Sequence, residues 1–384
     1  MILTLSDPTL DARIHRQADF LAAEYSVVVA AIGPPLQRPG IEAFELRWPS
    51  KGRAPRLADA AARIGLRLAS RYEHAYWAGE PMRRWRDELR RLGRFDAVVA
   101  NDLWGVPLAL AVADGAPVIF DAHEHWTSES ASWSRRHRLS MRGAHDWIVD
   151  HDVPRTASMM TVSPGIAHDY EQRVGVQPAL VTNAPYVSDL EPTPVGDPIR
   201  LLHVGLADPR RRLEDTIDAA RMLGDRFSLD IVLARDNEYR RRLEQMVATD
   251  ERIRILPAVA NDELIAFENS YDVGVFLLPD RFPNQIHVLP NKLFDYIQAR
   301  LAIAIGPSRE MAAIVNEWDC GVVSDSFSVA DFAAALDSLT PGAVARMKTN
   351  AHRAAAVLNA EHNREVVQQL VGGAIASTDQ PLRA

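Results

Sequence analysis

The sequence contains very little of several features that mark particular classes of protein. It has one cysteine, Cys320, among 384 residues, so no internal disulfide can form and a reducing, cytoplasmic compartment is expected. Lysine and arginine number 43 against 51 aspartates and glutamates, which gives a net charge of −8. A general nucleic-acid-binding protein would carry a basic excess, so no nucleic-acid partner is expected.

Long apolar runs and a secretory signal are also missing. Residues 1–5 are too short for the apolar core of a signal peptide, and Asp7 and Asp11 follow them closely. No apolar run approaches the ~20 residues that span a bilayer. We therefore expect a cytoplasmic protein that contacts the inner face of a membrane at most peripherally.

The first expected strand-to-helix turn, residues 6–13, contains no glycine. Residues 1–5 and 26–32 have the apolar composition of buried strands, and residues 13–24 between them have helical spacing. This order is a βαβ unit of a parallel sheet. A dinucleotide-binding turn would show G-x-G-x-x-G at this place, so a nicotinamide cofactor is not expected.

The rest of the chain repeats the alternation of strand and helix in two halves. Residues 188–198 between the halves are rich in proline and acid, as linkers often are. The pattern predicts an α/β protein of two Rossmann-like, doubly wound domains that face a central cleft. The expected organisation is an N-terminal domain at 1–189, a hinge linker at 190–198, a C-terminal domain at 199–371 and a flexible tail at 372–384.

The stretch at residues 282–305 has the clearest functional pattern. Asn291 is a good N-cap, and the apolar spacing of a helix begins directly after it. A helix N-terminus with Lys292 beside it attracts a phosphate, and Asp295, one turn further on, can accept two hydrogen bonds from a sugar diol. The pattern predicts a site for a nucleoside diphosphate, although such a pair is also common as a solvated surface pair.

A polar cluster follows the strand expected at residues 117–120. In an open α/β sheet, ligands bind at the carboxyl ends of the strands. His123 can hydrogen-bond a sugar hydroxyl or stabilise charge near a leaving phosphate; the alternative is a strand-end residue without a role. His123 and His125 would share a face of an extended strand, but no acid or cysteine cluster at ligand spacing accompanies them, so no metal site is expected.

Residues 289–306, LPNKLFDYIQARLAIAIG, resemble the sugar-nucleotide segment of GT-B glycosyltransferases, especially of the glycosyltransferase family 4 type. Members carry a P-(S/N)-K-hydrophobic-aromatic-E-Y pattern here. The resemblance covers nearly the whole chain and is weak before Asn101. It implies a GT-B architecture with the acceptor on the N-terminal domain and the donor on the C-terminal domain, and it also places His123 at the end of a family strand that reads D-x-H. The implied nucleotide-sugar-binding residues in this segment are Leu289, Asn291, Lys292 and Asp295.

Two other segments match the family with changes. Gly205 and the residues after it resemble a G-x5-K-G segment, in which Arg211 stands at the lysine and Arg210 precedes it. Because arginine can clamp phosphate oxygens with two hydrogen bonds, both arginines join Gly205 among the expected donor-site residues. Leu206 stands where the family has an arginine, so half of the usual diphosphate clamp is missing.

The second change concerns the family's E-x7-E pair, whose first acid lies near the transferred sugar. In this chain the pair is His287 and Asp295. The resemblance therefore makes His287 a candidate catalytic residue, together with His123. Since a histidine cannot supply the same negative charge, the role of the missing acid is either lost or passes to Asp280 or His287.

The resemblance implies a glycosyltransferase of polysaccharide biosynthesis that moves a sugar from a nucleotide-diphosphate sugar to a glycan, lipid-linked or small-molecule acceptor. It would retain the anomeric configuration and use no metal or other cofactor, with Lys292 and Arg211 neutralising the departing diphosphate. Two alternatives stay open. One is a sugar-nucleotide 2-epimerase of the same fold, and the other is a non-catalytic protein that only binds the nucleotide-sugar.

The segment at residues 81–94 is rich in arginine around Trp85 and Leu89. It is either a solvated helix with acid–base pairs or a peripheral contact with anionic lipid, since basic amphipathic helices with tryptophan bind such surfaces.

Overall fold

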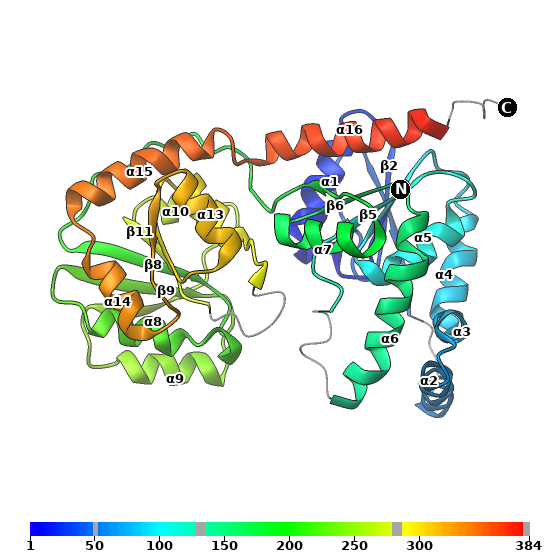
Figure 1. Ribbon diagram of the computed structural model, residues 1–384, viewed down its shortest axis with the longest axis horizontal. Helices are drawn as coiled ribbons and strands as arrows, with labels where there is room; N and C mark the ends of the chain where they lie inside the picture. The colour runs from blue at the N-terminus through cyan, green and yellow to red at the C-terminus, as the bar shows by residue number, and fades with distance from the viewer. Residues whose placement is uncertain (49–52, 128–134, 279–285, 379–384) are drawn as a thin grey trace. The chain divides into compact units, whose positions relative to one another are not determined.

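The structure, a computed structural model, describes residues 1–48, 53–127, 135–278 and 286–378 (Figure 1). It divides into two compact units, Met1–Thr182 with the chain from Asn363 onward, and Asn183–His362. Among the described residues, no helix is long and apolar enough to cross a bilayer.

The first unit is built on a seven-stranded, all-parallel sheet in the order β3-β2-β1-β4-β5-β6-β7. The central strand is short but fully buried, and it pairs on both sides, with Ile2 opposite Val29 and Val99. The strands are β1 (Ile2–Leu3), β2 (Val27–Ala31), β3 (Ile41–Glu45), β4 (Val98–Asn101), β5 (Val118–Ala122), β6 (Ser158–Thr161) and β7 (Ala179–Leu180). Its helices are η1 (Pro8–Leu10), α1 (Ala12–Ala22), α2 (Arg53–Leu68), α3 (Tyr72–Ala78), α4 (Glu80–Arg90), η2 (Leu103–Gly105), α5 (Val106–Val112), α6 (Arg135–His151), η3 (Val153–Arg155), α7 (Pro164–Val174) and α16 (Ala360–Thr378).

The second unit has a six-stranded parallel sheet in the order β10-β9-β8-β11-β12-β13. The near-continuous apolar strands are those expected of a sheet covered on both faces. The strands are β8 (Ile199–Gly205), β9 (Phe227–Leu233), β10 (Ile253–Pro257), β11 (Val273–Phe276), β12 (Ala302–Ile305) and β13 (Gly321–Val323). Its helices are η4 (Pro209–Arg211), α8 (Leu213–Arg221), α9 (Glu238–Val247), α10 (Leu264–Glu268), α12 (Asn291–Gln298), α13 (Arg309–Glu317), α14 (Val329–Asp337) and α15 (Pro341–Ala355). Together the two parallel sheets confirm the predicted α/β class.

The segment expected to be a hinge linker, residues 190–198, is bonded to the second unit. The buried guanidinium of Arg300 donates to the carbonyls of Ser188 and Leu190 at 2.7 and 3.1 Å. The buried ammonium of Lys348 donates to the hydroxyl of Thr193 at 2.9 Å. The chain crosses between the units instead at Thr182–Asn183 and His362–Asn363.

The C-terminal boundary also lies elsewhere than predicted. Residues from Asn363 onward belong to the first unit, whereas the predicted second domain ran to 371. The side-chain amide of Gln368 donates to the Phe20 carbonyl at 2.9 Å, and Val371 is buried. The predicted flexible tail begins at 372, yet α16 continues to Thr378; residues 379–384 lie outside the described chain.

The arginine-rich helix α4 has its apolar face in the core. Trp85 and Leu89 are completely buried, and the Trp85 indole donates to the Arg47 carbonyl at 3.0 Å. On the outer face, Arg84 pairs with Glu88 at 2.7 Å. Because Trp85 is occupied inside the protein, it is not available as a lipid anchor, and the solvated-helix interpretation fits α4.

Candidate functional site

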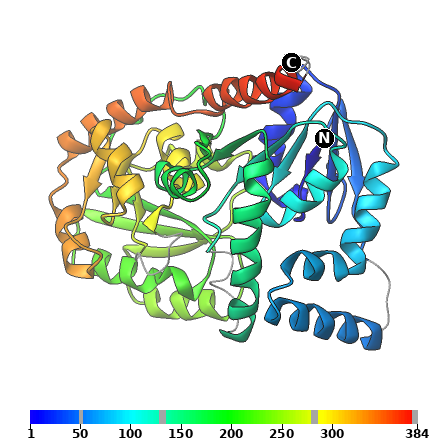
Figure 2. The ribbon, with the colours of Figure 1, turned by 45° about the vertical axis from the view of Figure 1, so that its right-hand side comes forward.

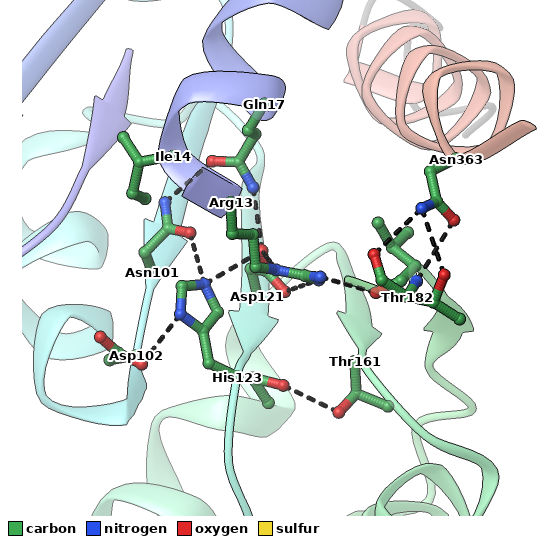
Figure 3. Close-up of polar contacts among 12 residues, drawn as sticks. Arg13, Ile14, Gln17, Asn101, Asp102, Asp121, His123, Thr161, Thr182 and Asn363 are labelled. Carbon is green, nitrogen blue, oxygen red and sulfur yellow. Dashed lines mark hydrogen bonds and ion pairs between the residues drawn. The ribbon is translucent and has the colours of Figure 1, made fainter. Parts of the chain in front are cut away.

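In the first unit, polar side chains meet where β4 and β5 end (Figure 3). Arg13 of α1 reaches the Asp121 carboxylate with two hydrogen bonds, Nε to Oδ2 at 2.7 Å and Nη2 to Oδ1 at 2.6 Å. The side chains are 5% and 0% exposed, respectively. The pKa of Asp121 is held far below its usual range, since Arg13 and His123 outweigh the opposing effect of burial. This buried ion pair joins α1 to the end of the sheet.

Two amides complete the network and orient His123. The Asn101 amide nitrogen donates to Gln17 Oε1 at 2.9 Å, and the Gln17 amide donates to Asp121 at 2.9 Å. Asn101 Oδ1 is thereby turned towards His123 Nε2, 2.9 Å away. An oxygen acceptor at that distance favours a proton on Nε2.

Carboxylates surround the imidazole of His123, which is 15% exposed. Nδ1 lies 3.5 Å from Asp102 Oδ1 and 3.9 Å from Asp11 Oδ2, while Nε2 lies 3.3 Å from Asp121 Oδ2. Burial alone would lower the pKa of His123, but Asp102 and Asp121 outweigh it and raise the pKa to about 9. The structure thus makes His123 a cation at neutral pH, able to donate hydrogen bonds and to stabilise negative charge.

Asp102 and Gln17 belong to this cluster although sequence reasoning did not select them. Asp102 has a positive φ of 62°, a conformation that costs energy for a residue with a side chain and is found more often at functional sites. Burial raises the pKa of Asp102 even though His123 is nearby. Its position directly after an expected strand was a usable signal, whereas Gln17 lies in an ordinary helical pattern.

In the second unit, β8 ends at Gly205 beside the N-terminus of α12. A Cβ on Gly205 would lie 3.1 Å from both Lys292 Nζ and His203 Nε2. The glycine therefore lets the ammonium approach the end of the strand. Lys292 Nζ also lies 4.1 Å from the centre of the Phe276 ring, a favourable cation–π distance.

Lys292 and Arg211 are two half-buried cations whose nearby acids, Asp295 and Glu268 for Lys292 and Asp208 for Arg211, offset the effect of burial only in part. Burial, and then the charge of Arg211, lowers the pKa of Lys292 to about 7. Burial likewise lowers the pKa of Arg211. Neither side chain has a hydrogen bond or ion pair within the described ranges. The charge of Arg211 lowers the pKa of Lys292, so a negative charge bound nearby would stabilise the charged form of this lysine.

The other expected donor-site residues are placed differently. Arg210 is exposed and bonds Asp208 at 2.6 Å, so its guanidinium is already occupied. Leu289 is 4% exposed and packs in the core, which leaves its backbone for any contact with a ligand. Asn291 was predicted as the N-cap, but Pro290 occupies the cap position and Asn291 is the first helical residue. The cap prediction is wrong because proline, which needs no N–H there, already has the extended backbone that precedes a helix.

Glu268 is a further acidic residue of this region that sequence reasoning missed. It is 0% exposed, and neither carboxyl oxygen has a hydrogen-bond partner among the described residues. Burial first, and then Asp295, raises the pKa of Glu268 well above its usual range, while Lys292 opposes the shift. Glu268 therefore lies within the electrostatic reach of both Asp295 and Lys292.

His287 faces an acid supplied by α13. Its Nδ1 lies 3.2 Å from Glu310 Oε1, and the two side chains are 14% and 7% exposed. Glu310 lies in the first turn of α13, whose N-cap is Ser308. Asp280, the other candidate for the missing acid, lies outside the described residues. Within the described chain, no group of three or more His, Cys, Asp or Glu side chains is placed to hold a metal ion.

Comparison with solved structures gives matches over essentially the whole chain. A sucrose-phosphate synthase from Thermosynechococcus elongatus is 14% identical, with 98% of each chain covered and a TM-score of 0.66. WaaG, a glycosyltransferase involved in lipopolysaccharide biosynthesis, is 14% identical, with 97% of this chain and 100% of that one covered and a TM-score of 0.64. Anabaena HepE in complex with UDP is 13% identical, with 97% and 99% covered and a TM-score of 0.68.

These structures share the GT-B glycosyltransferase fold, and the protein has that fold too. The GT-B prediction is therefore confirmed. No protein-family model and no curated protein sequence matches the chain. At such low identity, the likeness establishes the fold alone.

Proposed function

We propose that the protein is a glycosyltransferase with a nucleotide-diphosphate sugar as its donor. The observation that carries the proposal is Lys292 beside Gly205 at the end of β8, with Arg211 near enough to lower its pKa and with neither cation ion-paired to a described residue. A diphosphate supplies the negative charge that this site lacks. The solved structures of the same fold include HepE with UDP and with UDP-glucose, which makes UDP-sugars the first donors to test.

In the proposed reaction, the chain's own residues supply charge and orientation. Lys292 and Arg211 hold the diphosphate and neutralise the charge that grows on it as the glycosidic bond breaks, a role that a metal ion has in other enzymes. Asp295 accepts hydrogen bonds from the ribose hydroxyls. His123, protonated and fixed by Asn101, donates to a sugar hydroxyl. Transfer retains the anomeric configuration, and the acceptor is a glycan, a lipid-linked sugar or a small molecule.

His287 is proposed to act with Glu310 as one unit. The family acid at this position is replaced by a histidine, but Glu310 places a carboxylate 3.2 Å from its ring. The pair brings back a negative charge next to His287 and fixes the orientation of its imidazole. This pairing supports a catalytic role for His287 more than its sequence position alone does.

The test is a thermal-shift panel of UDP-, GDP-, ADP- and TDP-sugars on the wild type and on single-alanine variants of Lys292, Arg211 and Arg210. Loss of a charge-assisted hydrogen bond costs about 1.5–3 kcal/mol, so Lys292→Ala and Arg211→Ala should weaken donor binding at least about tenfold. Arg210→Ala is the matched control, because Arg210 already bonds Asp208, and it should change binding less than about twofold.

Product analysis separates the alternatives. Release of the nucleoside diphosphate, slow with water and faster with acceptor, supports a transferase. Interconversion of two sugar-nucleotides would indicate an epimerase, and binding without any turnover would indicate a protein that only binds the donor. If no nucleotide-sugar raises the melting temperature of the wild type, the proposed donor site is wrong.

A further inference from the structure

The first unit contains an open pocket that the proposed donor chemistry does not use. Its volume is 340 Å³, within the size range of small-ligand sites. One wall is α2, which lies against α3 (Figure 2), and the opposite wall includes Trp104 of η2. The lining residues are Trp48, Ala60, Arg63, Ile64, Arg67, Gly79, Pro81, Met82, Trp104 and Met141.

Two arginines, one helical turn apart on α2, line this pocket, and no acid of the described residues forms an ion pair with either of them. Within the described ranges, neither Arg63 nor Arg67 has an ion pair, and the Arg63 Nε donates only to the Asp59 carbonyl at 3.3 Å. The Arg67 Nε is buried and has no hydrogen-bond partner among these residues. Burial first, and then the charge of Arg63, lowers the pKa of Arg67. An anion bound here would satisfy both arginines.

The remaining lining is apolar and aromatic, and part of it is open to solvent. Trp48 is 60% and Ile64 47% exposed, and both are among the large apolar side chains that the protein leaves uncovered. The Arg67 guanidinium carbon lies 5.9 Å from the centre of the Trp104 ring. Leu68, 76% exposed, continues the apolar side of α2. Exposed apolar surface next to unpaired cations fits a ligand with an apolar chain and an anionic head group.

The pocket adjoins the carboxyl end of the sheet. Trp104 follows Asp102 by two residues, and Asp102 faces His123. The Trp104 carbonyl accepts a hydrogen bond from the Tyr76 hydroxyl at 2.9 Å, which fixes this turn against α3. A ligand held in the pocket is therefore held next to the strand ends of the His123 cluster.

We propose that this pocket binds the acceptor, and that the acceptor is an anionic amphiphile, an aliphatic chain that ends in a phosphate. In the transfer a phosphate oxygen forms the new bond to the anomeric carbon of the sugar, while the bond from that carbon to the donor diphosphate breaks and the nucleoside diphosphate leaves. The chain packs on Trp48, Ile64 and Trp104, and the phosphate pairs with Arg63 and Arg67. The identification of this ligand as the acceptor rests on the proposed glycosyltransferase function; its binding does not. A peripheral contact with anionic lipid is one expectation for the arginine-rich segment that forms α4; the proposal places that contact on α2 instead.

The experiment measures binding to the full chain by isothermal titration calorimetry, with dodecyl phosphate kept below its micelle concentration. Dodecanol and inorganic phosphate are the comparison ligands, since each has one half of the proposed chemistry. We expect dodecyl phosphate to bind at least about tenfold more tightly than either, because each half of the ligand contributes. The double variant Arg63→Gln/Arg67→Gln should lose at least about tenfold in affinity for it.

Two further variants keep the test specific. Ile64→Glu puts a negative charge between the two arginines on an exposed position and should abolish binding without unfolding the protein. Arg84→Gln is the matched control, since Arg84 is an exposed arginine of the same unit that is already paired with Glu88, and it should bind dodecyl phosphate like the wild type. Circular dichroism and thermal melting report the fold of each variant.

The proposal is overturned if dodecanol binds as well as dodecyl phosphate, if inorganic phosphate does, or if the double arginine variant binds normally. Self-association abolished by Ile64→Glu, with no dodecyl phosphate bound, would assign the surface to a contact between copies of the chain. Donor binding should be unchanged in every variant of this pocket. Donor binding absent from the wild type, with dodecyl phosphate bound as expected, would refute the glycosyltransferase proposal and leave the amphiphile site.

Discussion

The raised pKa of His123 predicts that the stability of the protein falls in mildly alkaline solution. An unperturbed histidine titrates near pH 6.5, whereas the carboxylates of Asp102 and Asp121 raise the pKa of His123 to about 9 in the folded protein. A group whose pKa is higher in the folded state stabilises the fold fully below its unfolded pKa. That stabilisation is lost as the pH rises through the folded value, here between about pH 6.5 and 9.

The magnitude follows from the size of the shift. A change from 6.5 to about 9, at 1.36 kcal/mol per pKa unit, corresponds to roughly 3 kcal/mol of unfolding free energy. The side chain is only 15% exposed, so solvent screens its interactions with Asp102 and Asp121 weakly. A loss of this size is a large part of the stability of an ordinary domain.

The assay is urea unfolding of the wild type and of His123→Gln at pH 6, 7.5 and 9.5, followed by tryptophan fluorescence. Other groups also titrate in this range, so the informative quantity is the difference between the two proteins in unfolding free energy. We expect this difference to be largest at pH 6 and to shrink by roughly 3 kcal/mol at pH 9.5. A difference that does not change with pH would show that the pKa of His123 is the same in the folded and unfolded protein, and the electrostatic argument for the cluster would fail.

Three other changes have equally definite outcomes. Arg13→Met should destabilise the protein by about 3–5 kcal/mol, since it leaves the buried Asp121 carboxylate without its arginine; Arg13→Met/Asp121→Leu should recover part of that loss in the same urea assay, because it removes the buried charge but also the carboxylate that Gln17 and His123 contact. Donor affinity should decrease about tenfold per pH unit above pH 7, because the pKa of Lys292 is about 7 and the diphosphate needs its ammonium form; calorimetry of Lys292→Arg should show a flat profile. Gly274→Ala should cost about 1–3 kcal/mol of unfolding free energy, since the new Cβ would lie 2.3 Å from the buried Tyr296 ring.

Each of these three has an outcome that contradicts it. A double variant as unstable as Arg13→Met would mean that Asp121 is not the source of the loss. A Lys292→Arg profile as steep as that of the wild type would place the titrating group elsewhere. A Gly274→Ala protein with wild-type stability would show that the Tyr296 ring can move aside without cost.

The sequence could predict those parts of the site that depend on neighbouring residues in the chain. The helix that begins at Asn291 and the strand ends before His123 follow from short apolar periods and turn residues. Lys292 is the second residue of its helix, so its position near the proposed diphosphate site could be predicted from the local sequence. The unneutralised pairing of Lys292 with Arg211 joins residues about eighty positions apart, and only the family resemblance indicated it.

The features that could not be predicted depend on long-range packing. Glu268 is an ordinary acid in a short helix until burial removes its solvent. The partner of His287 comes from the following strand–helix unit, as Glu310. Residues 190–198 have the composition of a linker, and nothing in that composition shows that Arg300 and Lys348, far along the chain, donate hydrogen bonds to the segment and its flank. Amino-acid composition indicates how stiff the backbone of a segment is, whereas a hinge is a segment that makes few tertiary contacts with the domains on either side.

The two units differ in how their buried charges are balanced, and this difference separates their roles. In the first unit the charge of Arg13 is matched by Asp121, and His123 has carboxylates on both sides. Because these charges balance one another, the cluster needs no charged ligand, and it is suited to orienting neutral hydroxyl groups. In the second unit burial and the charge of Arg211 lower the pKa of Lys292, and neither cation has an ion pair among the described residues. Cations that are partly removed from water and have no ion pair among the described residues lower stability, and the proposed diphosphate would bring a compensating negative charge. The charge balance therefore supports the proposed diphosphate site on physical grounds that do not depend on the family resemblance, as the arginines Arg63 and Arg67 support the separate phosphate site proposed in the first unit.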